Sequence, residues 1–300
     1  MGKPAKVTKY VVDGNSLNNT IDGTTYSADI QSRGMLINGN DGNDVLKGGS
    51  GQDVLTGGNG NDTLIADLSD LIGAGDGTTV YDGGSGSDTL DLSGIANAPS
   101  TGLWIQAANG AKGFNFIRTD VTYHHGSLNI DPVNYSSTYG NNFKNIENFI
   151  LGDGNDVIQL LTPTGDNRIE GRGGDDHILA GDGNDVVDGG TGNDLISGGW
   201  GNDVLTGGDG NDAFVFQGRV TGQYTYDTIT DFNTAADQVW LYGTWTIDWD
   251  QNSPNTLHAY LRDNGAVFGE VTFQGLTLAD AALIQVQHID PNTGDPFGGP

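Results

Sequence analysis

The stretch that decides the fold runs from Thr162 to Val215 and reads TPTGDNRIE GRGGDDHIL AGDGNDVVD GGTGNDLIS GGWGNDVLT GGDGNDAFV. It consists of six consecutive nine-residue units with no residue inserted between them. Glycine stands at position four of every unit, and a large apolar residue stands at position eight. Position six holds Asn167, Asp176, Asp185, Asp194, Asp203 and Asp212. A period of this length, held in strict phase, indicates a solenoid.

Each part of the unit has its own physical role. The glycines let the first six residues turn sharply and leave backbone carbonyl groups free to point inward, at φ values that other residues avoid. Position six adds a charged oxygen, and such a set suits Ca²⁺, which takes about six to eight oxygen ligands. The last three residues favour a short strand that directs position eight into a core. One unit is then half a turn, so alternate units stack on the same side with parallel strands ~4.8 Å apart.

This stacking predicts where ions bind. Alternate units would share an ion between their position-six residues: Asp176 with Asp194, Asp185 with Asp203, and Asp194 with Asp212. A fourth site, between Asn167 and Asp185, has one carboxylate fewer, and we expect it to be weaker. The predicted fold class is all-β: a parallel β-roll, or β-solenoid, of calcium-binding nonapeptide repeats with a strand-rich insert and a β-rich C-terminal cap.

A disordered linker is the alternative interpretation, because 50 glycines and a high net charge can indicate one. Low-complexity tracts do not hold phase, so the strict period argues against it. The units resemble those of the repeats-in-toxin (RTX) family, whose hemolysin-type calcium-binding repeats form a parallel β-roll. The resemblance implies that several Ca²⁺ ions are the cofactor.

An earlier block, residues 39–91, carries the same pattern. Its regular units are GNDGNDVLK (39–47), GGSGQDVLT (48–56) and GGNGNDTL (57–64). Asp44 and Asp62 are two units apart, so we expect them to share an ion, whereas Asp53 should lie on the opposite side.

After a one-residue deletion, the pattern continues in degenerate form to residue 91 and retains Asp70 and Asp88. Asp70 would then pair with Asp53 and with Asp88, although loop 65–70 lacks glycine.

The predicted metal ligands are the position-six residues and the position-four glycines of both blocks. At position six these are Asp44, Asp53, Asp62, Asp70, Asp88, Asp156, Asn167, Asp176, Asp185, Asp194, Asp203 and Asp212. At position four they are Gly42, Gly51, Gly60, Gly174, Gly183, Gly192, Gly201 and Gly210.

Composition points to the same ion. The chain has 12 basic residues against 39 acidic ones and a formal net charge of −27, and its only glutamates are Glu147, Glu170 and Glu270. Short aspartates suit turns and metal loops. Without cations the folded chain would repel itself, and nucleic acid and anionic membrane surfaces are poor partners for it.

The 300 residues include no cysteine, which excludes disulfides, thiolate zinc sites and a cysteine nucleophile. A metal can take the place of disulfides in stabilising such a chain. No apolar run approaches the ~20 residues of a membrane span, and the N-terminus has no signal-peptide core. Secretion would therefore need a route that does not read the N-terminus.

The predicted division of the chain follows these patterns. It comprises an N-terminal cap (1–38), a first repeat block (39–91), a strand-rich insert (92–150), a second repeat block (151–215) and a C-terminal cap with the secretion region (216–300). The insert contains alternating stretches at 102–107 and 114–119 that favour strands. Its aromatic residues could form a small core or contact sugar. His124 and His125 could form a metal site, act as a titrating switch or lie in a loop, and adjacent strand residues point to opposite faces.

Two stretches outside the regular units resemble RTX proteins. Asn145-Ile146-Glu147-Asn148 matches the N-I-E-N stretch that leads back into the repeats, and residues 213–243 resemble the segment that closes the roll in serralysin-type proteases. The matching residues there are Asp227, Ile229, Asp231, Phe232, Asp237, Val239 and Leu241. The three aspartates could bind a further ion or face water, and we expect the cap tryptophans to be buried. The resemblance implies a C-terminal signal for the type I secretion machinery, although Pro296-Phe297-Gly298-Gly299-Pro300 departs from the usual apolar ending.

No catalytic motif emerges. H-E-x-x-H is absent, and the G-x-S-x-G-like stretches fall in repeat loops. Carboxylate pairs of the glycosidase type remain an alternative among so many aspartates, but calcium already explains their spacing. We expect a secreted, noncatalytic calcium-binding protein that folds on extracellular Ca²⁺ and acts as a structural or surface-interacting component, with itself or a cell-surface polysaccharide as partner. The alternatives are an export or stability module allied to a secreted protease, lipase or alginate epimerase, and a glycan-binding adhesin module.

Overall fold

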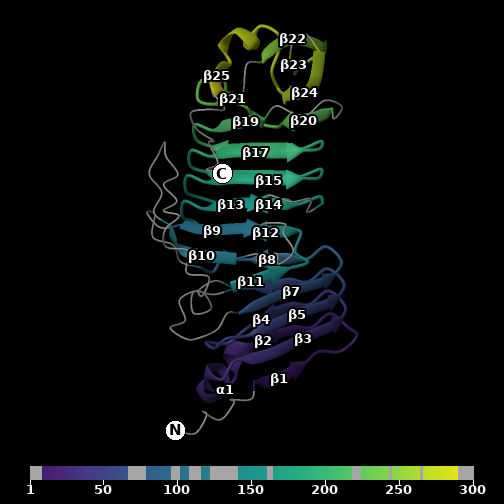
Figure 1. The fold of residues 1–300 in the computed structure, drawn as a ribbon, viewed down its shortest axis with the longest axis vertical. Coiled ribbons are helices and arrows are strands. Elements are labelled where there is room, and N and C mark those ends of the chain that lie inside the picture. Colours follow the sequence, from purple (N-terminus) through teal and green to yellow (C-terminus); the bar gives the residue numbers. More distant parts are fainter. Residues whose placement is uncertain are drawn as a thin grey trace. The chain divides into compact units, whose positions relative to one another are not determined.

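The computed structural model describes residues 9–66, 79–95, 102–107, 116–121, 141–160, 165–217, 224–242, 245–263 and 266–289. The chain forms two compact units. The first comprises residues 1–96, 114–119 and 134–150, and the second comprises 97–113, 120–133 and 151–300. Both are built from stacked short strands (Figure 1). Asp70 and the pair His124-His125 lie outside the described residues.

The first unit has two parallel sheets. One contains, in spatial order, β1 (Tyr10–Asp13), β3 (Met35–Asp41), β5 (Val54–Asn59), β7 (Val80–Ser85) and β11 (Asn141–Lys144). The other contains β2 (Thr20–Asp22), β4 (Val45–Lys47), β6 (Thr63–Ile65), β8 (Thr89–Asp91) and β12 (Asn148–Ile150). A 3₁₀ turn (η1, Gly23–Thr25) and a short helix (α1, Ala28–Ser32) separate β2 from β3, and β10 (Phe116–Val121) pairs with β11 in antiparallel fashion.

The second unit repeats this design over more strands. Its first sheet is wholly parallel and contains β9 (Gly102–Ala107), β13 (Val157–Leu160), β15 (His177–Asp182), β17 (Leu195–Trp200), β19 (Ala213–Gln217), β21 (Gln238–Tyr242) and β25 (Gln285–Ile289). Its second sheet contains β14 (Arg168–Glu170), β16 (Val186–Thr191), β18 (Val204–Asp209), β20 (Thr225–Ile229), β24 (Ala266–Gln274), β23 (Thr256–Asp263) and β22 (Thr246–Ser253).

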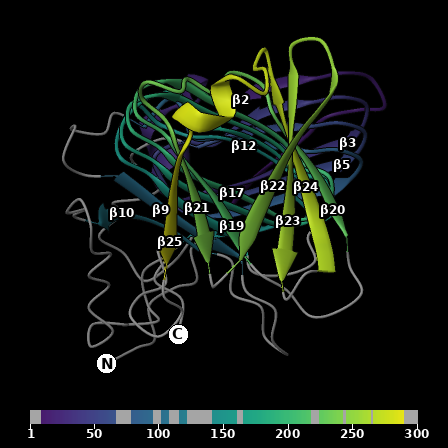
Figure 2. The ribbon, with the colours of Figure 1, turned by 90° about the horizontal axis from the view of Figure 1, so that it is seen from above.

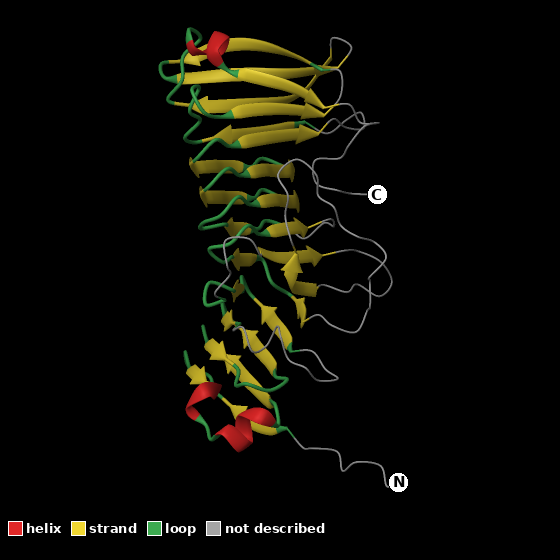
Figure 3. Ribbon diagram, turned by 90° about the vertical axis from the view of Figure 1, so that its left-hand side faces the viewer, coloured by secondary structure: helices red, strands yellow, loops and turns green. Residues whose placement is uncertain are grey.

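The second sheet changes character at its end. It is parallel up to β24, and β23 and β22 then continue it in antiparallel order. A 3₁₀ helix (η3, Asp280–Leu283) precedes β25. Figure 3 shows that helix is confined to short stretches of the described chain. None of the helices drawn there has the length and apolar composition needed to cross a bilayer.

The register confirms the half-turn period. Leu46 lies opposite Leu64, Ile178 opposite Ile196, and Val187 opposite Leu205, so strands two units apart pair in parallel. The apolar position eight fills the core, with at most 1% of each side chain exposed, at Leu46, Leu55, Leu64, Tyr81, Leu90, Ile158, Ile169, Ile178, Val187, Ile196, Leu205 and Phe214. The predicted all-β parallel roll is confirmed.

Two predicted pairings are wrong, that of Asp53 with Asp70 and that of Asp70 with Asp88. Leu55 lies opposite Tyr81 and Leu64 opposite Leu90, so the ladder passes over the degenerate unit that contains Asp70. Asp53 donates its N–H to the Thr79 hydroxyl (3.2 Å), in the place expected for Asp70. The physical reason is that loop 65–70 lacks the glycines that a half-turn needs.

Candidate metal centre

The aspartates at position six are fixed by one of their two oxygens. The N–H of Asp176 donates to Asp194 Oδ1 at 2.8 Å, and the N–H of Asp194 donates to Asp212 Oδ1 at 2.9 Å. The same link joins Asp44 to Asp62, Asp62 to Asp88, Asp156 to Asp176, Asn167 to Asp185, and Asp185 to Asp203. The structure therefore brings together the five pairs predicted from the regular units, and it adds Asp62 with Asp88 and Asp156 with Asp176, which were not predicted.

The second oxygen of most of these carboxylates is buried and unsatisfied. Within the described part of the chain, Oδ2 has no hydrogen-bond partner in Asp44, Asp62, Asp88, Asp176, Asp185, Asp194, Asp203 and Asp212. Buried polar groups are nearly always paired, and a buried charge without a counterion is costly. Eight such atoms in one repeated geometry indicate that a cation belongs beside them.

The absence of a side chain at the position-one glycine lets a carboxylate oxygen and a carbonyl oxygen approach the backbone closely. A β-carbon built on Gly39 would lie 2.2 Å from Asp44 Oδ2 and 2.5 Å from the Gly57 carbonyl oxygen. The same construction at Gly189 meets Asp194 Oδ2 at 2.4 Å and the Gly207 carbonyl oxygen at 2.7 Å. Gly57, Gly83 and Gly171 repeat the arrangement. A carboxylate oxygen and a carbonyl oxygen thus converge beside this glycine, and hard oxygen ligands of this kind fit calcium.

The glycine at position four allows adjacent coils to approach closely. Gly192 adopts φ of +134°, and a β-carbon there would lie 1.9 Å from the Gly174 carbonyl oxygen. Positive φ recurs at Gly42, Gly60, Gly174, Gly183 and Gly201. No group of three or more acidic, histidine or cysteine side chains gathers at one point among the described residues. The arrangement therefore suits an ion that takes many of its oxygens from the backbone.

Two predicted carboxylates differ from the rest. Asp53 Oδ2 accepts the N–H of Gly49 at 2.7 Å, and Asp156 Oδ2 accepts the N–H of Gly152 at 2.9 Å. Their Oδ1 atoms accept the N–H groups of Met35 and Leu103, and neither of these donors stands at position six of a repeat. Both oxygens of these two side chains are therefore already bound within the protein.

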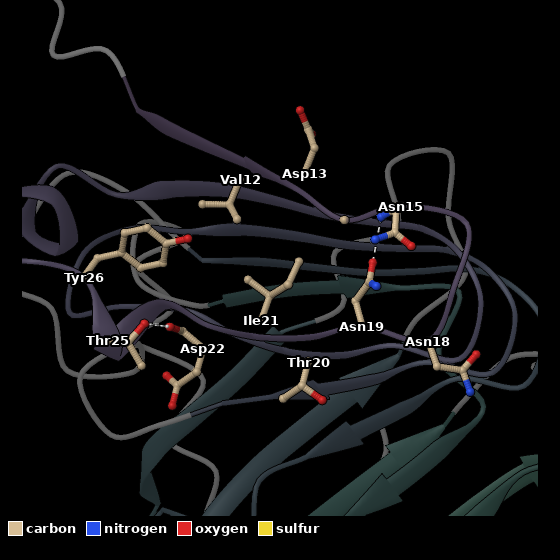
Figure 4. Close-up of a pocket in the computed structure, with 11 residues that line it drawn as sticks. Val12, Asp13, Asn15, Asn18, Asn19, Thr20, Ile21, Asp22, Thr25 and Tyr26 are labelled. Carbon is tan, nitrogen blue, oxygen red and sulfur yellow. Dashed lines mark hydrogen bonds between the residues drawn. The ribbon is translucent and has the colours of Figure 1, made fainter.

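Asn19 was missed by the sequence analysis. Residues 14–22 (GNSLNNTID) form a first coil in which the N–H of Asn19 donates to Asp44 Oδ1 at 2.6 Å. Asn19 Oδ1 accepts the N–H of Asn15 at 2.7 Å beside an open cavity of about 450 Å³ (Figure 4). The sequence feature that could have identified this coil is Ile21 at position eight, which lies opposite Leu46. The unit was not identified because position six holds an amide, Asn19, where the repeat pattern has an aspartate.

The series of hydrogen bonds between position-six residues, which we call the ladder, also includes residues from irregular segments. The N–H of Asp88 donates to Glu147 Oε2 at 2.9 Å, so a glutamate from the N-I-E-N stretch takes the place of a repeat aspartate. In the cap, Asp203 donates to Asp227 Oδ1 and Asp212 donates to Asp237 Oδ1. Asp227 and Asp237 are therefore buried members of the ladder and do not face water.

A second ladder, also missed, runs through position five. The N–H of Asn193 donates to Asp175 Oδ1 at 2.7 Å, and the N–H of Asn211 donates to Asn193 Oδ1 at 3.1 Å. Here the later residue donates to the earlier side chain, whereas at position six the earlier residue donates to the later one. Each loop is thus bonded to its neighbours in both directions. The signal was the frequent asparagine at position five.

Burial changes the acidity of the carboxylates. It raises the pKa of Asp185 and Asp194 to about 7, and that of Asp88, Asp203 and Asp212 to about 6, against partial opposition from the backbone N–H bonds. The pKa of Asp176 rises well above its ordinary value, first because of burial and then because of the charges of Asp156 and Asp194. A cation at these oxygens would favour the ionised form, so protons and calcium should compete.

The cap tryptophans Trp240, Trp245 and Trp249 were expected to be buried, and the structure buries Trp245 and leaves the other two half-buried. Trp245 is buried and its ring packs at 4.4 Å from that of Phe268. Trp249 is half-buried and its ring lies 5.8 Å from Phe273, which agrees with a role in the packed cap. Trp200 is also only half-buried, and its indole nitrogen is enclosed.

Comparison with known proteins agrees with the geometry. The family model of the RTX calcium-binding nonapeptide repeat matches residues 36–68, 164–196 and 179–214. The chain therefore carries RTX calcium-binding nonapeptide repeats, and repeats of this kind bind calcium ions. No curated protein matches the chain in sequence.

Two solved structures are similar in part. The extracellular lipase LipA of Serratia marcescens is 18% identical over 85% of this chain and 38% of the lipase, with a TM-score of 0.23. The AlgE6R3 subunit of the mannuronan C5-epimerase of Azotobacter vinelandii is 20% identical over 51% of this chain and 83% of that subunit, with a TM-score of 0.19. The chain thus spans well under half of the lipase.

Proposed function

We propose that this chain is a secreted calcium-binding RTX protein that folds on binding extracellular Ca²⁺ and serves as a noncatalytic structural or surface-interacting component. The observation that carries the proposal is the set of eight buried Oδ2 atoms without a partner. Their burial is unfavourable in the absence of a cation, so the compact state and the ion-bound state should coincide.

The proposed ligands are the eight aspartates with a free Oδ2, together with backbone carbonyls of the loops, such as those of Gly57 and Gly207. Asn167 offers an amide oxygen in place of a carboxylate, and we infer a weaker site there. The Oδ2 atoms of Asp53 and Asp156 already accept the N–H groups of Gly49 and Gly152, so each has one lone pair fewer for an ion, and we infer weaker sites there. Bound calcium supplies positive charge, and the chain supplies the oxygens and their spacing.

Coupling between binding and folding supports secretion as the setting. In the unfolded chain the loops cannot hold a carboxylate near the carbonyls of the next coil, so the binding free energy becomes folding free energy. Extracellular calcium modules bind at about 10⁻⁴–10⁻³ M. A chain with this affinity would stay unfolded where calcium is scarce, pass the type I secretion machinery unfolded, and fold outside the cell.

A calcium titration of the full chain tests the proposal, with circular dichroism and light scattering recorded on one sample. We expect a cooperative gain of β-structure with calcium and little gain with an equal concentration of magnesium, whose smaller shell demands stricter geometry. Particle growth with calcium would favour a structural assembly, and constant size would favour a soluble surface-interacting role. A chain that is compact and unfolds cooperatively in EDTA would show that the coupling is wrong.

A further inference from the structure

The cap carries an exposed sheet face that the calcium loops do not use. Strands β20, β24, β23 and β22 lie side by side in the second unit (Figures 1 and 2). On β23 the alternate residues Leu257, Ala259 and Leu261 are at most 2% exposed, so the residues between them point to the opposite face. Buried Val271 and Phe273 orient β24 in the same way. The outward residues form what we call the tyrosine face: Tyr224, Tyr226, Asp248, Asp250, His258, Tyr260, Arg262, Glu270 and Thr272.

The register places these side chains in a row. Tyr226 lies opposite Glu270, Glu270 opposite Tyr260, and Tyr260 opposite Asp248. At one end of the row, the rings of Tyr226 and Tyr224 lie 4.7 Å apart, with 56% and 40% of these residues exposed. Two adjacent exposed rings are a large apolar contact with polar ends, which is a combination enriched at binding surfaces.

Ion pairs hold the polar groups of the face in position. His258 Nδ1 lies 2.7 Å from Glu270 Oε1, and the Thr272 hydroxyl lies 3.4 Å from the same nitrogen. Arg262 Nε donates to Asp248 Oδ2. The pairs orient donors and acceptors beside the rings. The face carries the carboxylates of Asp248, Asp250 and Glu270 against the Arg262 guanidinium and the His258 imidazole, so it has no excess of positive charge that would attract an anionic polymer.

We propose that the tyrosine face binds a neutral polysaccharide. Exposed rings can stack on the apolar face of a sugar ring, while the neighbouring carboxylate, imidazole and guanidinium groups can hydrogen-bond to its hydroxyls. The net charge of −27 disfavours anionic polymers. Two exposed rings fall well short of the about 800 Å² per partner of a stable protein interface. A row of side chains along a sheet suits an extended chain, because small ligands are bound in concave sites.

The test is affinity electrophoresis of the full calcium-loaded chain through gels containing xyloglucan, galactomannan, dextran or anionic alginate. We expect retardation by at least one neutral polymer and none by alginate. The double variant Tyr224→Ala/Tyr226→Ala should weaken retention roughly tenfold, since a ring contact contributes up to about 1.4 kcal/mol. Tyr10→Ala is the matched control, because Tyr10 is 42% exposed but lies in the first unit.

A second variant separates binding from folding. Glu270→Gln keeps the shape of the side chain but removes the charge that pairs with His258, and it should weaken retention less than the double tyrosine variant. Each variant should keep the calcium response of the parent chain by circular dichroism. Absence of retardation by all three neutral polymers, or retention unchanged by loss of both tyrosines, would overturn the inference. Loss of the calcium response in the parent chain with retention intact would overturn only the proposed calcium function.

Discussion

Two loops with nearly the same sequence differ in the hydrogen bonds that their position-six aspartate makes. GGTGND (189–194) and GGSGQD (48–53) share the repeat pattern, yet Asp194 Oδ2 is unpartnered and Asp53 Oδ2 accepts the N–H of Gly49. The difference lies in what stacks against each loop. Asp194 accepts from Asp176 of a regular repeat, whereas Asp53 accepts from Met35, just after α1. The motif alone therefore does not define an ion site, because the neighbouring coil completes it.

Among these tests, removal of calcium should produce the largest difference between the two kinds of loop. As EDTA withdraws the ions, we expect the N–H groups of Asp176 and Asp185, which donate to carboxylates with a free Oδ2, to lose protection before that of Met35. A site held at about 100 times its Kd contributes about 2.7 kcal/mol, so loss of several ions exceeds the stability of most domains. Hydrogen exchange followed by mass spectrometry measures this order. Simultaneous loss at all three amides would remove the distinction between the loops.

Asp194→Asn should have the next largest effect. The asparagine oxygen can still accept the N–H of Asp176, but the charged Oδ2 is lost. We expect a loss of about 2–3 kcal/mol in calcium, which corresponds to one vacated site. Thermal unfolding in calcium measures it. Asp209→Asn, at the exposed position three of the unit 207–215, removes the same charge without changing a position-six carboxylate and should leave the midpoint nearly unchanged.

A fall in pH should stabilise the fold of the calcium-free chain, whereas in the presence of calcium it should weaken calcium binding. The folded, calcium-free pKa values of Asp185 and Asp194 are raised from 3.8 to about 7, so their contribution to stability is present at acid pH and is lost as the pH rises through about 7. Calcium-free chain should therefore gain β-structure between pH 8 and pH 5. In calcium the same protons compete with the ion, so more calcium should be needed at pH 5. Circular dichroism over this range, with EDTA and with calcium, would refute the assignment if both series moved together.

Asp53→Asn should have the smallest effect. Its two oxygens accept N–H groups from Met35 and Gly49, so the variant loses about one hydrogen bond, worth about 1 kcal/mol. The calcium midpoint should shift less than for Asp194→Asn, and isothermal titration compares the two variants directly. Equal shifts would mean that both loops hold an ion in the same way.

The nine-residue period accounts for the strand register and the aspartate pairs that could be predicted from the sequence. A nine-residue period with fixed glycines requires alternate units to pair, and this placed Ile178 opposite Ile196 and joined Asp176 to Asp194. Outside the strictly periodic units, residue spacing no longer predicts which residues lie opposite each other. Asn19 and Glu147 occupy the position-six place with other side chains, and the partner expected in Asp70 is replaced by Thr79. The predicted domain boundaries and ligand assignments stay predictions.

The sequence by itself determined the parallel roll, the buried column at position eight and the calcium chemistry of the loops, because these follow from local periodicity and from glycine and aspartate at fixed spacing. Only the tertiary structure decided which carboxylates keep a free oxygen, since that depends on the coil stacked against each loop. It also decided the tyrosine face. Tyr226, Glu270 and Tyr260 have no common period, and only strand pairing across the cap brings them into one row.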